Sequence, residues 1–169
     1  MERKGIVMFK GTPVTLQGQD IRVGDIAPNF TAIGRDLQPV KLDSLKGSIV
    51  IISAVPSLDT PVCELQTKRF NEEAAKLKVK LLTISMDLPF AQSRFCDSFK
   101  IDNITMLSDY KDREFGLRYG VYIEELGLLA RSVFIVDADG KLAYKQIVKE
   151  IGEQPDYDPV LSEAKNLGA

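Results

Sequence analysis

The chain has 169 residues, of which 44% are hydrophobic and 27% charged, and its 22 basic and 24 acidic residues give a formal net charge of −2. This composition excludes a disordered chain. The sequence contains no basic block, which disfavours nucleic-acid binding, and no run of about 18 apolar residues that could span a membrane. The chain has no histidine and only two cysteines, which excludes Ser-His-Asp and Cys-His nucleophile pairs, histidine-ligated metals and iron–sulfur clusters.

The beginning of the chain predicts an accessory β-hairpin within residues 1–18. Two short β-prone runs, 5–10 and 14–16, are separated by the turn-forming sequence Gly-Thr-Pro. The strongest strand follows at residues 49–55. It is apolar on both faces, which is typical of a central strand covered by helices on both sides.

Helices and strands then alternate to the end of the chain. The pattern predicts helices over 61–77, 90–99, 113–119 and 158–167, and strands over 81–86, 106–109, 133–137 and 142–148. The last two strands form a hairpin. This order predicts one α/β domain, 1–169, with a mixed central sheet flanked by helices.

Cys63 occupies a position suited to a nucleophile. It follows the central strand, where open α/β sheets bind their ligands, and Thr60 and Pro61 suit the N-cap and first position of the next helix. Free N–H groups and the helix dipole then favour the thiolate form of a cysteine in the first turn. The alternative is a buried structural cysteine, since free cysteines are commonly buried.

Cys96 lies 33 positions beyond Cys63, which excludes a C-x-x-C dithiol. Phe95 and Phe99 form an i, i+4 apolar pair, so Cys96 could simply border the core. It could also be a resolving thiol that attacks an oxidised Cys63 and forms a disulfide with it.

Residues 56–70, PSLDTPVCELQTKRF, closely resemble the peroxidatic loop of peroxiredoxins, in particular the bacterial thiol peroxidase subfamily. The likeness continues through residues 24–30 and 129–137 and covers nearly the whole chain. The resemblance implies a thioredoxin-like fold, with a mixed sheet, flanking helices and an extra N-terminal β-hairpin.

The resemblance also implies roles for individual residues. Cys63 matches the peroxidatic cysteine, Thr60 the hydroxyl beside it, and Pro56 the proline that shields the loop. Arg131 matches the arginine that reaches the site from a neighbouring strand, and Cys96 matches the resolving cysteine. Spacing alone does not distinguish Arg131 from the other arginines.

The activity implied is reduction of hydrogen peroxide or an organic hydroperoxide, without a cofactor or metal. Cys63 becomes a sulfenic acid, a Cys63–Cys96 disulfide follows, and thioredoxin reduces it. The resemblance further suggests a homodimer. Because the chain begins without a signal-peptide pattern, we expect it in the cytoplasm, with no membrane partner. Two alternatives remain open: a redox sensor that uses the same disulfide to act on a partner protein, and a non-catalytic α/β binding domain.

Overall fold

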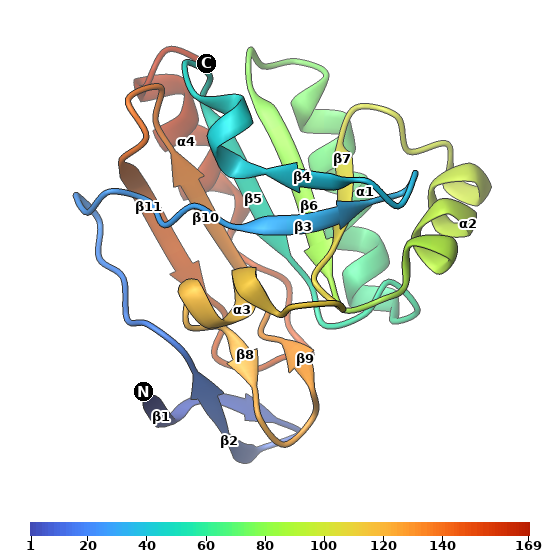
Figure 1. Ribbon diagram of the computed structural model, residues 1–169, viewed down its shortest axis with the longest axis vertical. Helices are drawn as coiled ribbons and strands as arrows, with labels where there is room; N and C mark the ends of the chain where they lie inside the picture. Colours follow the sequence, from blue (N-terminus) through green and yellow to red (C-terminus); the bar gives the residue numbers. More distant parts are fainter.

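A computed structural model describes all residues, 1–169, and its main element is a seven-stranded mixed sheet (Figure 1). The strands are β3 (Thr31–Gly34), β4 (Pro39–Lys41), β5 (Val50–Ala54), β6 (Lys80–Ser85), β7 (Thr105–Ser108), β10 (Ser132–Val136) and β11 (Leu142–Ile147). Their spatial order is β11-β10-β5-β6-β7-β3-β4. Strands β5, β6 and β7 are parallel, and the other neighbours pair antiparallel.

The centre of this sheet is formed by strands that are buried on both faces. All five residues of β5 and all five of β10 are buried. In the register, Ile51 lies opposite Ile135 and Ile52 opposite Phe134, so apolar side chains line both faces. The predicted thioredoxin-like α/β fold with a mixed central sheet is confirmed.

Helices cover both faces of the main sheet (Figure 1). The four α-helices are α1 (Pro61–Ala74), α2 (Pro89–Phe99), α3 (Glu114–Arg118) and α4 (Tyr157–Asn166), and a 3₁₀ turn spans Leu42–Leu45. Phe70 of α1 and Val160 of α4 pack on one face of the sheet. Phe115 of α3 and Phe134 of β10 meet edge-to-face in the larger cluster on the other face, with ring centroids 6.1 Å apart. None of the helices combines the length and apolar character needed to cross a bilayer.

A second sheet of four strands lies at one end of the molecule, in the order β1-β2-β8-β9 (Figure 1). Strands β1 (Glu2–Phe9) and β2 (Thr12–Gln17) form the predicted N-terminal hairpin. The sequence analysis missed β3 in the main sheet, and here it missed β8 (Tyr122–Ile123) and β9 (Leu128–Leu129). Strands of two residues have no measurable periodicity, and pairing with β2 stabilises them here.

Some predicted boundaries were wrong by a few residues. Helix α1 ends at Ala74 and not at Leu77, because the chain turns after Ala75 while Leu77 still packs against the core. The apolar stripe therefore continues beyond the end of the helix. Helix α2 begins one residue before its predicted start, with Pro89 in its first turn, where a missing N–H costs nothing.

Asp109 is a buried carboxylate that ties the end of β7 to helix α3. Its two oxygens accept hydrogen bonds from the backbone N–H groups of Phe115 (3.0 Å) and Gly116 (2.8 Å). Burial outweighs these bonds and raises the pKa of Asp109 from 3.8 to about 6. Between pH 3.8 and about 6, Asp109 is therefore protonated in the folded state and ionised in the unfolded state. The free energy of unfolding falls as the pH rises through this range, and the stability that the protonated carboxyl contributes is lost above about pH 6.

We expect Asp109→Asn to become favourable relative to the wild type as the pH rises. Asparagine cannot ionise, so the difference between the two free energies of unfolding should shift in favour of the variant by about 2 kcal/mol between pH 4 and pH 7. Urea unfolding at both pH values measures this difference. Parallel stability curves for the two proteins would contradict it.

Candidate active site

Cys63 lies in the first turn of helix α1, immediately after the loop that leaves the central strand β5. Thr60 is the N-cap, and its hydroxyl oxygen accepts a hydrogen bond from the backbone N–H of Cys63 at 3.4 Å. Pro61 occupies the start of the helix, as the sequence predicted. Cys63 is fully buried, and its sulfur is a free thiol.

Arg131 reaches this cysteine from the start of β10. Its Nη2 donates to Cys63 Sγ at 3.3 Å, its Nη1 to Gln66 Oε1 at 2.9 Å, and its Nε to the carbonyl of Ile151 at 2.9 Å. The arginine is only 1% exposed, and no carboxylate forms an ion pair with it. A buried guanidinium bound to neutral groups favours negative charge nearby, and Cys63 is the neighbour that can supply it.

Gln66 connects the arginine to the central strand. It lies one turn after Cys63 in α1 and is fully buried. Its amide nitrogen donates to Ser53 Oγ at 2.7 Å, while its oxygen accepts from Arg131. This pair of bonds fixes which end of the amide faces Arg131, and so fixes the guanidinium beside the sulfur.

A cavity of about 300 Å³ lies against this group. Thr60 and Arg131 line it together with Pro56, which is buried at the end of β5. The rest of the wall is largely apolar and comes from segments far apart in the sequence, namely Phe9, Val62, Leu126, Leu128 and Ile151. The cavity therefore presents a cation and a hydroxyl in a largely apolar wall. The Cys63 sulfur does not line the cavity and lies 3.3 Å from Arg131 Nη2.

Cys96 lies in the third turn of helix α2 and is also a free, buried thiol. It belongs to the same small apolar cluster as Cys63, together with Leu58 and Met106. Burial raises the pKa of Cys96 above its ordinary value of 9.0, and nearby Arg35 partly opposes this. The structure therefore brings all five predicted site residues to one end of the sheet. Three of them line the cavity, and Cys96 packs with Cys63 in the adjoining apolar cluster.

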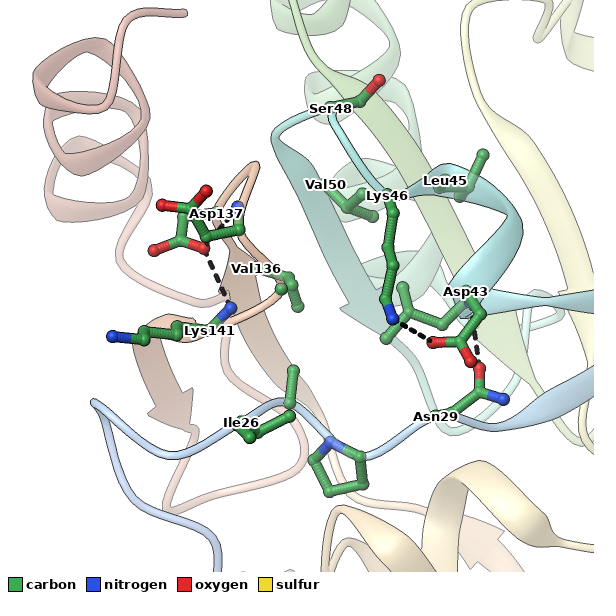
Figure 2. A pocket seen from close by; sticks show the side chains of 15 residues that line it. Ile26, Asn29, Asp43, Leu45, Lys46, Ser48, Val50, Val136, Asp137 and Lys141 are labelled. Carbon is green, nitrogen blue, oxygen red and sulfur yellow. Dashed lines mark hydrogen bonds and ion pairs between the residues drawn. The ribbon is translucent and has the colours of Figure 1, made fainter.

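A larger hollow, of about 500 Å³, lies at the opposite end of β5 and β10, beside Val50 and Val136 (Figure 2). Two bonds hold its rim: Lys46 and Asp43 form an ion pair at 3.8 Å, and Asn29 Oδ1 accepts from the backbone N–H of Asp43. It contains no cysteine. No group of three or more His, Cys, Asp or Glu side chains is placed to hold a metal ion anywhere in the chain.

Comparison with known proteins identifies the family. Residues 22–161 match the Redoxin family. The thiol peroxidase of Bacillus subtilis (strain 168) is 52% identical over 162 residues, which cover 95% of this chain and 97% of that protein. The chain belongs to the Redoxin family.

Solved structures of other redoxins agree with this assignment. A peroxiredoxin-like protein from Aquifex aeolicus superimposes with a TM-score of 0.91 at 48% identity, over 98% of this chain and 97% of that one. A thiol peroxidase from Chromobacterium violaceum has a TM-score of 0.83 at 22% identity, over 95% of each chain, and supports the fold. The prediction of a peroxiredoxin-type oxidoreductase that reduces peroxide with a thiol is confirmed.

Gln66 is the residue of this redoxin site that the sequence analysis missed. The signal was present: Gln66 lies one turn after Cys63 and one turn before Phe70, on the helix face that packs against the sheet. A polar side chain at such a position needs a buried partner. Which partner it has could not be read from the sequence, because Arg131 is 65 positions away.

We expect Gln66→Met to slow peroxide reduction about tenfold or more, because it removes the bond that orients Arg131 and leaves that arginine with an unpaired donor. Single-turnover oxidation of the reduced protein by hydrogen peroxide measures the effect. Gln66→Glu can still accept from Arg131 but gives it a carboxylate counter-charge, so this variant should slow the reaction as well. A rate for Gln66→Met equal to that of the wild type would contradict the role of this glutamine.

Proposed function

We propose that Cys63 is the peroxidatic thiol and that Arg131, Thr60 and Pro56 form its site. The observation that carries this proposal is the buried Arg131 guanidinium, 3.3 Å from Cys63 Sγ and without a carboxylate partner. Such a cation stabilises the thiolate, which is the reactive form of cysteine. The N-cap position adds the backbone N–H groups of the first turn of α1.

In the first step the Cys63 thiolate attacks one oxygen of the hydroperoxide. The S–O bond forms, the O–O bond breaks, and the other oxygen takes up a proton and leaves as water or an alcohol. Negative charge moves from the sulfur toward the two oxygens. The Arg131 guanidinium is a donor that can follow this charge, and would thus stabilise the transition state more than the ground state. The Thr60 hydroxyl donates to the Ser57 carbonyl in this structure, and it can add a second bond only by turning its proton toward the peroxide oxygens.

In the second step the Cys96 thiolate attacks the sulfenic acid of Cys63. The S–S bond forms, the S–O bond breaks, and the departing hydroxide takes up the proton that the Cys96 thiol released, so that water leaves. A disulfide requires Cα atoms about 4.4–6.8 Å apart, and both cysteines lie within helices. We therefore expect helix α2 to unwind locally before the bond closes.

Thioredoxin then reduces the disulfide. We further propose that the protein acts in the cytoplasm and that it forms a homodimer. Family membership supports the reductant. The dimer finds support in two exposed apolar side chains near the start of α2, Leu88 and Phe90, which are 51% and 69% exposed. Sedimentation of the reduced protein tests the dimer.

The cavity supports a substrate range that includes bulky organic hydroperoxides as well as hydrogen peroxide. Its wall beyond Thr60 and Arg131 is mainly apolar, and its volume of about 300 Å³ is at the lower end of ordinary ligand pockets. An alkyl or aryl group could bury its surface there while the peroxide oxygens face Arg131.

We expect Cys63→Ser to abolish peroxide reduction. Cys96→Ser should keep the first turnover and lose recycling by thioredoxin. The measurement adds one equivalent of cumene hydroperoxide to the reduced protein, followed by peptide mapping without reductant. A Cys63–Cys96 cross-linked peptide in the wild type is the expected product. Persistent peroxide with both thiols free, or full recycling of Cys96→Ser, would contradict the proposal.

We also expect Leu126→Ser to discriminate between substrates. This half-buried side chain lines the cavity but does not contact Cys63 or Arg131 through a hydrogen bond. Loss of apolar contact should raise KM for cumene hydroperoxide about tenfold, as expected for roughly 1.5 kcal/mol of lost burial, and leave the reaction with hydrogen peroxide unchanged. Equal effects on the two substrates would show that the apolar wall does not bind the organic group.

A further inference from the structure

Asp87 connects the two segments that carry the reactive thiols. It lies between strand β6, which ends at Ser85, and helix α2, which begins at Pro89. Its carboxylate accepts two hydrogen bonds from the loop before Cys63: Oδ1 from the Ser57 hydroxyl at 3.0 Å, and Oδ2 from the backbone N–H of Leu58 at 2.8 Å.

The backbone of Asp87 is itself held in place by the sheet. Its N–H donates to Ser85 Oγ at 3.3 Å, and its carbonyl accepts from the Ser108 hydroxyl at 2.6 Å. Gln92, in the first turns of α2, donates to the same Ser85 hydroxyl at 3.0 Å. The carboxylate is therefore presented to the loop from the ends of two neighbouring strands, β6 and β7, and its position does not depend on the loop.

The effect of Asp87 reaches the catalytic loop through Ser57. The carbonyl of Ser57 accepts from the Thr60 hydroxyl at 3.2 Å, and that hydroxyl oxygen in turn accepts from the N–H of Cys63. Thr60 is exposed and has no other side-chain partner that would orient it. The placement of Ser57 thus determines the direction of the Thr60 hydroxyl at the cavity.

We propose that Asp87 is a positioning residue for both thiols: it holds the Cys63 loop in the shape that reacts with peroxide, and it restrains closure of the Cys63–Cys96 disulfide. The second effect follows from connectivity. For the sulfurs to meet, the loop must move relative to the start of α2, and the two bonds to Asp87 join these segments. The inference rests on the proposed roles of Cys63 and Cys96.

Removal of the carboxylate should therefore change the two chemical steps in opposite directions. We expect Asp87→Ala to slow oxidation of Cys63 about tenfold and to speed disulfide closure about tenfold, the usual size of an effect from losing hydrogen bonds to a charged group. Loss of a carboxylate elsewhere in the sheet, such as that of Asp137, should not combine these two changes. Because its sulfenic acid is shorter-lived, Asp87→Ala should also resist over-oxidation to the sulfinic acid.

The experiment mixes reduced protein with hydrogen peroxide, quenches the reaction with acid at successive times, and measures intact masses. The masses separate thiol, sulfenic acid and disulfide, so each step has its own rate constant. Asp87→Asn is the conservative variant. Its amide can accept from Leu58 N–H and donate to Ser57 Oγ, so both rates should stay within about threefold of the wild type.

Two further variants isolate the effect. Arg35 donates to Ser93 Oγ at 3.2 Å and to Asp97 Oδ1 at 3.0 Å, on the helix that carries Cys96, and does not touch the loop. Arg35→Ala should therefore leave peroxide oxidation unchanged, which separates an effect on helix α2 alone from an effect on the Cys63 loop. Asp137→Ala removes a carboxylate that accepts two backbone bonds at the opposite end of the sheet, and should alter neither rate.

The outcomes distinguish the inference from the function on which it rests. If Asp87→Ala shows wild-type rates for both steps, or if both rates fall together, Asp87 does not position the two thiols. Should the alanine variant fail to fold, Ser57→Ala removes one of the two bonds, and unchanged rates in that variant would overturn the inference equally. If the wild type does not consume peroxide, or Cys63→Ser still does, the proposed function itself is wrong.

Discussion

The guanidinium of Arg131 lies in the interior of the protein with 1% of its surface exposed, and its partners are an amide, a carbonyl and a thiol. To remove such a charge from water is costly unless hydrogen bonds and a counter-charge compensate for it. Here the hydrogen bonds come from α1 and from the segment after β11. No carboxylate supplies a counter-charge, and among the three partners of Arg131 only the thiol of Cys63 can become an anion.

Much of the surrounding structure can be understood as support for this arrangement. The central strand β5 places Ser53 beneath Gln66 and delivers the chain to the loop before Cys63. The second sheet closes the other side: β1 and β9 bring Phe9 and Leu128 to the cavity wall. The short strands β8 and β9 also deliver the chain to Arg131, so the second sheet contributes to the site as well as to the core.

The sequence predicted most reliably what depends on neighbouring residues. The apolar run at 49–55 is typical of a strand buried on both faces, and Thr60 with Pro61 marked a helix start because capping is a local interaction. The pairing of Gln66 with Arg131 is not local. Residue spacing offers no reason to choose this arginine, and the resemblance to peroxiredoxins was needed to select it. The division of the chain into one domain, and the roles of the site residues, remain predictions.

The complete burial of Cys63 has a consequence for chemoselectivity. An exposed thiolate reacts with many electrophiles, including alkylating agents and the disulfides of other proteins. Because the Cys63 sulfur is fully covered in the folded protein, a large electrophile or a protein disulfide cannot reach it unless the surrounding helix and loop move. A hydroperoxide in the cavity beside Arg131 needs to bring only its two oxygens to the sulfur, so the burial that shelters the charge of Arg131 also favours peroxides over other thiol reagents.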